Sequence, residues 1–166
     1  MKNPTATKLA SVMFYIVTAV FVLNLAALIA LPILFGLQAG HILANNIRGG
    51  IVPETFALTL FLEICGVCTA IILWQARRIL MSLRRGMPFK KENAGYMKTA
   101  GISCFFISGA ALIRAIHDGI VYGIASFASY NTLFVPVALF AGLLCLVMAA
   151  LFFQAAELKD DNDLVI

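Results

Sequence analysis

Two side chains of opposite charge, Glu63 and Arg114, occur in the middle of apolar stretches long enough to cross a membrane. An ionised side chain near the centre of a span costs about 2.5–3.5 kcal/mol on insertion scales, so such charges should be paired. From the rise of an α-helix, Glu63 and Arg114 lie about 3 Å and about 6 Å to the same side of the midplane. We predict an ion pair between them, with Asp118 and Asn24 around it. This intramembrane polar cluster is either a clasp that fixes helix register or a site that senses a proton or a small ligand.

A C-x-x-C sequence, formed by Cys65 and Cys68, is the second arrangement that could do chemistry, because redox dithiols have this spacing. Both residues, like Cys104 and Cys145, fall inside apolar stretches, where thiols are inert. We interpret them as small packing residues and keep a membrane thiol oxidoreductase as a minor alternative. A metal site of Cys65, Cys68 and His117 is disfavoured, because His117 is expected near the outer face. Since the sequence has no phosphate-binding loop and no hydrolase motif, we predict a protein that is not an enzyme and has no cofactor or metal.

The elements that must position these residues are membrane-crossing helices. The chain has 166 residues, of which 62% are hydrophobic and 12% charged, whereas soluble proteins have about 25% charged residues. We predict an all-α, single-domain bundle of four transmembrane helices with up-down-up-down topology. Small residues, among them Gly101 and Gly142, favour close helix contacts. The expected spans, each long enough for a membrane crossing of about 20 residues, cover about 9–35, 55–76, 99–122 and 133–156.

The distribution of basic residues predicts the orientation of these helices. Two lysines precede the first span, seven lysines and arginines lie in the loop 77–98, and Lys159 follows the last span, whereas Arg48 stands alone on the opposite side. Cytoplasmic loops carry an excess of lysine and arginine, so we expect both termini, the loop and the tail 157–166 to be cytoplasmic. The first apolar run is too long for a signal peptide, and we interpret it as an uncleaved helix.

Four basic residues of the loop, Arg77, Arg78, Arg84 and Arg85, fall within one arc of a helical wheel. We expect the second helix to continue past the membrane and to end near Gly86, a residue suited to a left-handed conformation. The simplest interpretation of the loop is that it marks the cytoplasmic side. The arginine arc also fits the anionic lipids of the inner leaflet, at about 1 kcal/mol for each basic residue near the surface. Direct nucleic-acid binding is disfavoured, because no recognition motif occurs.

Two short motifs lie in the segments that are predicted to be cytoplasmic. They are a G-x-P-F…E-N turn and an E-L-x-x-x-N-D-L tail, formed by Gly86, Pro88, Phe89, Glu92 and Asn93 and by Glu157, Leu158, Asn162, Asp163 and Leu164. On these motifs and their distances from the spans, the chain resembles a family of small bacterial four-helix membrane proteins catalogued as a domain of unknown function. The resemblance covers nearly the whole chain and implies the bacterial inner membrane. Many members have a threonine after the Asp-Leu pair, where this chain has Val165.

Members of that family are often encoded beside a small helix-turn-helix regulator of the Cro/CI type. The resemblance therefore implies a non-enzymatic regulatory, sensor or scaffold protein with a cytoplasmic partner such as a transcription regulator. The basic loop and the acidic tail favour one shared docking surface, and a homodimer is the expected assembly. Two alternatives stay open. In one, the turn is only structural and Asn93 caps the third helix; in the other, an oligomeric transporter or channel uses Glu63 and Arg114.

Overall fold

A computed structural model describes residues 4–44, 51–87, 90–123 and 130–163 of the chain. Each helix contains a segment that is long and apolar enough to cross a membrane. The predicted all-α class and its four membrane-crossing helices are therefore confirmed, and the chain is a multi-pass membrane protein. The described residues form the helices α1 (Pro4–Ala44), α2 (Ile51–Arg84), α3 (Lys91–Tyr122) and α5 (Tyr130–Asp163).

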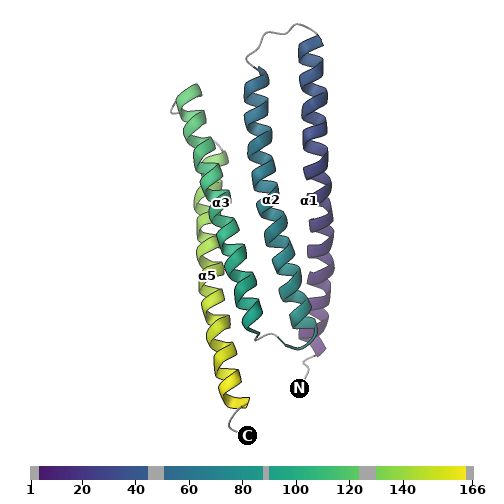
Figure 1. Cartoon of the computed structure of the whole chain (residues 1–166), viewed down its shortest axis with the longest axis vertical. Helices are drawn as coiled ribbons and strands as arrows, with labels where there is room; N and C mark the ends of the chain where they lie inside the picture. The colour runs from purple at the N-terminus through teal and green to yellow at the C-terminus, as the bar shows by residue number, and fades with distance from the viewer. Residues whose placement is uncertain (1–3, 45–50, 88–89, 124–129, 164–166) are drawn as a thin grey trace.

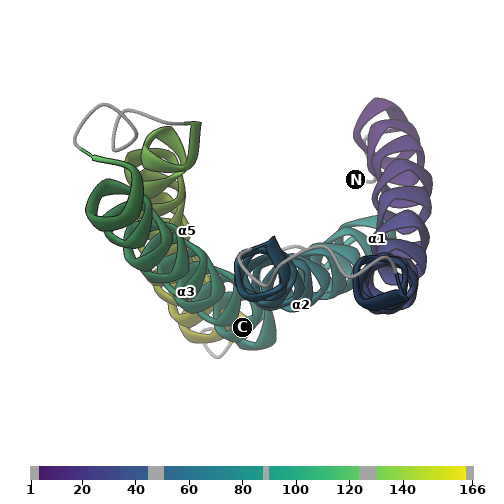
Figure 2. The same ribbon diagram turned by 90° about the horizontal axis from the view of Figure 1, so that it is seen from above.

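The helices run alternately up and down, so both ends of the chain lie at the same end of the molecule as the turn between α2 and α3 (Figure 1). We call this end the turn end. Contacts join α1 to α2, α2 to α3 and α3 to α5, and the view from above shows an open arc with α1 at one extremity and the α3–α5 pair at the other (Figure 2). The membrane-crossing segment of α3, which contacts both α2 and α5, is the most buried of the four, whereas the apolar window of α1 has no buried residue.

The backbones of α3 and α5 approach each other closely at Gly101 and Gly142. A Cβ atom on Gly101 would lie 3.0 Å from the carbonyl oxygen of Gly142, and one on Gly142 would lie 3.1 Å from the carbonyl oxygen of Gly101. Backbones come this close only where neither residue has a side chain. Farther along the same contact, the Ser108 hydroxyl donates a 3.0 Å hydrogen bond to the carbonyl oxygen of Val135. The close contacts expected from the small residues are thus formed between α3 and α5.

The contact between α1 and α2 has a pair of aromatic rings at each end and a glycine, Gly66, between them. Phe35 and Phe56 have ring centroids 5.8 Å apart, and Phe21 and Trp74 have centroids 5.7 Å apart. Between these pairs Gly66 faces α1, where the nearest atoms to its missing Cβ belong to Leu28. These pairs fix the register of two antiparallel helices and decide which neighbour each polar residue of α2 meets.

Candidate functional site

The turn between α2 and α3 is closed by backbone hydrogen bonds around Gly86, which has a φ of 75°. The Gly86 amide donates to the carbonyl oxygen of Leu83 at 3.0 Å, and the Met87 amide donates to that of Ser82 at 3.1 Å. This pair of bonds is the Schellman arrangement, which satisfies carbonyl groups that the end of a helix leaves free. The expectation that Gly86 ends the second helix in a left-handed conformation is confirmed. Pro88 and Phe89 of the predicted turn motif lie outside the described residues.

Asn93 connects the two helices across this turn. It is only 1% exposed, and its side-chain nitrogen donates a 3.1 Å hydrogen bond to the Ser82 hydroxyl, which in turn donates a 2.6 Å bond to the carbonyl oxygen of Met87. The residue at the cap position of α3 is Lys90, and no side chain caps the helix there. The hypothesis that Asn93 caps the third helix is therefore wrong. A buried amide must find partners, and Asn93 finds one on α2 instead.

A cavity of about 220 Å³ opens beside this connection, between the end of α2 and the start of α3. We call it the turn cavity. Its basic side chains are Arg78, Arg85 and Lys90, and its acidic side chain is Glu92, so its lining carries a net charge of plus two (three bases, one acid). Tyr96 forms an aromatic wall, and Met81, Met87, Ser82 and Asn93 complete the lining.

Two of the four arginines predicted to face lipid lie over aromatic rings of α1. The Arg77 guanidinium lies 5.5, 5.5 and 5.4 Å from the ring centroids of Phe14, Phe21 and Trp74, and its buried Nε makes no hydrogen bond. Arg84 lies over Phe14 at 5.0 Å. Rings within about 6 Å attract a guanidinium through their negative faces, most strongly where water is excluded. These two arginines therefore join α2 to α1.

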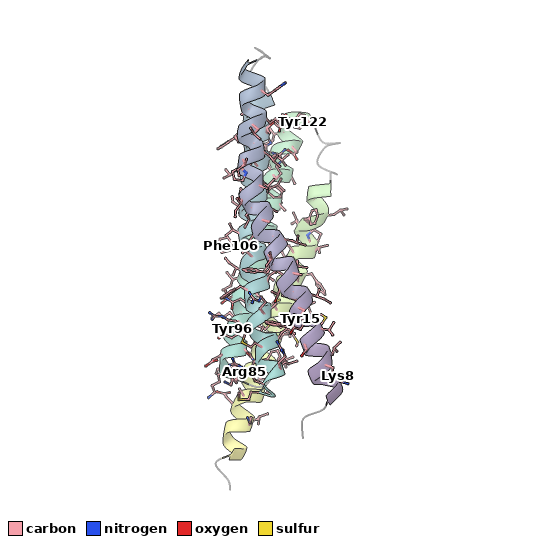
Figure 3. All side chains as sticks on the ribbon, turned by 90° about the vertical axis from the view of Figure 1, so that its right-hand side faces the viewer. Lys8, Tyr15, Arg85, Tyr96, Phe106 and Tyr122 are labelled. Carbon is pink, nitrogen blue, oxygen red and sulfur yellow. The ribbon has the colours of Figure 1, made fainter. Side chains whose placement is uncertain are left out.

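The other two arginines turn toward α3. Arg78 lies 5.5 Å from the ring centroid of Trp74 and 5.2 Å from that of Tyr96, and both Arg78 and Arg85 line the turn cavity. The predicted arc divides because α2 lies inside the row of helices, and residues seven apart share one of its two contact faces. Figure 3 shows Arg85 and Tyr96, with Lys8 and Tyr15, toward the turn end, and Tyr122 at the opposite end.

The ring contacts were not predicted from the sequence, although a signal was present. Phe14 and Phe21 are seven residues apart on α1, and Arg77 and Arg84 have the same spacing on α2. On two antiparallel neighbours such spacings place basic and aromatic residues on facing sides. Which helix packs beside each face of α2 depends on the arrangement of the helices in the arc. The sequence pattern does not determine that arrangement.

In the membrane-crossing part of α3, the structure pairs Arg114 with Asp118. The Nε atom of Arg114 lies 3.1 Å from Oδ1 of Asp118, and the two side chains are 11% and 10% exposed. Nε and Nη1 of Arg114 have no hydrogen-bond partner, so the contact has the distance of an ion pair without the direction of a hydrogen bond. His117 places its Nδ1 atom 3.4 Å from the same Asp118 oxygen. Two members of the predicted polar cluster thus meet one helical turn apart.

The structure does not bring Glu63 to Arg114. Glu63 lies one turn from Gly66, on the side of α2 that meets α1, whereas Arg114 lines an apolar hollow with Ile64 on the side that meets α3. Oε1 of Glu63 and Oδ1 of Asn24 are buried without a hydrogen bond. Because α1 and α2 are antiparallel, Asn24 and Glu63 also lie on opposite sides of the contact at Gly66. Equal depth is therefore insufficient, since Glu63 lies on the side of α2 that meets α1, whereas Arg114 belongs to α3 on the other side of α2.

The four cysteines are free thiols within the membrane-crossing helices. Cys68 is buried and Cys65 is half-buried, both on α2. Cys104 on α3 and Cys145 on α5 lie on the two sides of one helix contact, where a Cβ atom on Gly142 would lie 3.2 Å from Cβ of Cys104 and one on Gly101 would lie 3.2 Å from Cβ of Cys145. This thiol pair lies beside the close contact of Gly101 and was not predicted from the C-x-x-C spacing.

The acidic tail prolongs α5 beyond the turn between α2 and α3 (Figure 1). Glu157 and Leu158 are exposed. Asn162 and Asp163 lie in the last described turn of the helix, but their side chains and Leu164 lie outside the described residues. The association of the tail with the basic loop stays a prediction.

Comparison with known proteins gives one match. Residues 5–166 match the family described as "Protein of unknown function (DUF2975)", so the match includes the four helices, the turn and the tail. No curated protein and no solved structure matches the chain.

Proposed function

The chain belongs to the DUF2975 family of proteins of unknown function, and on this basis we propose that it is a non-enzymatic regulatory or scaffold protein of the bacterial inner membrane. Its binding surface is the turn cavity, which it presents to a cytoplasmic partner such as a helix-turn-helix transcription regulator. The observation that supports this proposal best is the convergence of Arg78, Arg85 and Lys90 on one cavity at the turn end. The acidic tail leaves the membrane at the same end and completes the surface.

The hydrogen bonds of the cavity favour binding over catalysis. A nucleophilic hydroxyl needs a neighbouring base that takes its proton. The Ser82 hydroxyl instead gives its proton to the carbonyl oxygen of Met87 and accepts from Asn93. Three of the other polar side chains of the lining, Arg78, Arg85 and Lys90, are cations, which hold an anion by charge and by hydrogen bonds.

We propose a cytoplasmic turn end because basic residues concentrate there. Arg77, Arg78, Arg84, Arg85 and Lys90 all lie at the last turns of α2 or the start of α3. On the opposite side the sequence has only Arg48, which lies outside the described residues. Cytoplasmic loops carry such an excess of lysine and arginine.

A labelling experiment checks this orientation. In a cysteine-free background, a cysteine at Lys91 should be protected from a membrane-impermeant maleimide in intact cells and should react after the membrane is opened. A reporter that works only in the cytoplasm should be active when it is fused after Ile166. Labelling of position 91 from outside would reverse the orientation and remove the cytoplasmic partner from the proposal.

The function itself is tested by chemical crosslinking in native membranes, followed by capture of the tagged full chain and mass spectrometry. We expect a helix-turn-helix protein to be enriched with the wild type and to fall several-fold with the Lys90→Gln variant. The matched control is Lys98→Gln, because Lys98 is also a basic residue of the α3 segment but lines a different hollow, beside Gln154. Equal capture by both variants, or recovery of lipid and self-crosslinks alone, would contradict the proposal.

A further inference from the structure

The charged side chains that line the turn cavity are of the kind that binds an oxyanion. Its net charge of plus two comes from side chains of two helix ends, Arg78 and Arg85 on one side and Lys90 on the other. Its volume is about 220 Å³, and a water molecule occupies about 30 Å³ of liquid. The cavity therefore has room for a phosphate group and the first carbons esterified to it.

Arg78 is held in the orientation that such a group requires. Its guanidinium lies 5.5 Å from the ring centroid of Trp74 and 5.2 Å from that of Tyr96, and a guanidinium can stack on a ring through its flat face, which leaves the N–H groups along its edge available. Arg78 contacts these rings, and it forms no ion pair or hydrogen bond with any described residue. An oxyanion that carries two oxygens side by side matches that free edge.

The remaining parts of the site are fixed by the turn. The bonds from Asn93 to Ser82 and from Ser82 to Met87 hold the two helix ends at a set distance. Lys90 occupies the cap position of α3, where no side chain caps the helix. The start of a helix carries a partial positive charge that adds to those of the cations. Glu92, the one acid of the lining, reduces the charge without cancelling it.

Aromatic residues of the turn end, of which Tyr96 lines the cavity, indicate that this end lies at the depth of lipid headgroups. Trp74, Tyr96 and Tyr15 all contact arginines of the turn end, and Trp and Tyr are the residues enriched at membrane–water interfaces. Trp74 is 43% exposed, so its ring is accessible to the same layer. A ligand anchored in the membrane reaches the cavity without leaving the bilayer.

We infer that the turn cavity binds a phosphate group, and that an anionic phospholipid of the adjacent leaflet supplies it. The inference rests on the proposed function, because it names a ligand for the same binding surface. The edge of the Arg78 guanidinium and the Lys90 ammonium hold the phosphate oxygens, and Arg85 closes the open side. The lipid fixes the conformation of the surface that the cytoplasmic partner meets.

The experiment uses the full chain in an uncharged detergent and its single tryptophan, Trp74, as reporter. Short-chain phosphatidylglycerol should change Trp74 fluorescence saturably and should appear as one bound copy in native mass spectrometry. Diacylglycerol of the same chain length, which lacks the phosphate, should do neither. Glycerol 3-phosphate is the soluble arm: if it binds as tightly as the lipid, the phosphate site stands and its natural ligand is soluble.

Variants separate the cavity from general attraction to a basic surface. We expect Arg85→Gln and Lys90→Gln each to weaken phosphatidylglycerol binding about fivefold, which is the usual contribution of one basic residue near an anionic surface. Lys98→Gln removes the same charge outside the cavity and should leave binding unchanged. An equal loss with Lys98→Gln, or no saturable copy of either phosphate compound, would overturn the inference. Partner capture that survives while lipid binding fails would leave the proposed function intact.

Discussion

Replacement of Asp118 by asparagine should lower the free energy of unfolding by about 3–5 kcal/mol, because it removes the charge that compensates a buried arginine. Arg114 is only 11% exposed and has Asp118 at 3.1 Å. Because both side chains are about nine-tenths buried, little water reaches Arg114 to take over the role of the carboxylate. The quantity to measure is the unfolding free energy of the detergent-solubilised chain, for example by steric trapping.

Glu63→Gln is the matched control, since it also converts one acid of a membrane-crossing helix into its amide. The Glu63 Oε1 atom is buried without a hydrogen-bond partner, so the unfolding free energy should stay the same or rise. A double-mutant cycle adds a second criterion. Arg114→Gln should couple to Asp118→Asn and should add to Glu63→Gln within about 0.5 kcal/mol. A strong coupling to Glu63 would restore the ion pair expected from the sequence and refute the arrangement of the structure.

A methyl group on Gly101 should cost about 1–3 kcal/mol, the usual range for overpacking of a tight contact. The new Cβ atom would lie 3.0 Å from the carbonyl oxygen of Gly142 and 3.2 Å from Cβ of Cys145. The first of these is a backbone atom and cannot move without shifting α5. The variant Gly101→Ala should therefore have a lower melting temperature, measured by circular dichroism. The double variant with Gly101→Ala and Gly142→Ala should have a melting temperature that is lower still.

Gly109→Ala tests whether this loss comes from the contact or from the substitution itself. Gly109 lies on the same helix, and a Cβ atom there would meet nothing within 4 Å. Alanine is a better helix former than glycine by about 1 kcal/mol, so this variant should be neutral or more stable. Equal destabilisation by both variants would mean that the approach of α3 to α5 is looser than the structure shows.

The helices and their number could be predicted from the sequence because the membrane imposes them. A span needs a long apolar run, and only α-helices satisfy their backbone hydrogen bonds alone in lipid. The end of α2 at Gly86 was also predictable, since the left-handed position there is a local requirement. Such features depend on residues that are neighbours in the sequence.

The partners of the polar residues could not be predicted, because they depend on which helices are neighbours. Glu63 and Arg114 have compatible depths, yet α2 directs Glu63 toward α1, while Arg114 finds Asp118 on its own helix. Arg77 and Arg78 are adjacent in the sequence and contact different helices, α1 and α3. A helical wheel gives the direction in which each side chain leaves its helix. It does not say which neighbouring helix lies in that direction.

The open arc also determines the order in which the protein comes apart. Because α1 contacts α2 at one extremity of the row and the rest of its surface meets lipid, it can be withdrawn without disturbing any other helix. The α3–α5 pair, joined by the glycine contact and the bond from Ser108 to Val135, has to be broken as a unit. A chain extracted mechanically from its amino end should therefore yield α1 first, then α2, and last a helical hairpin that resists the highest force. During synthesis, the half that emerges last is the one that assembles most firmly.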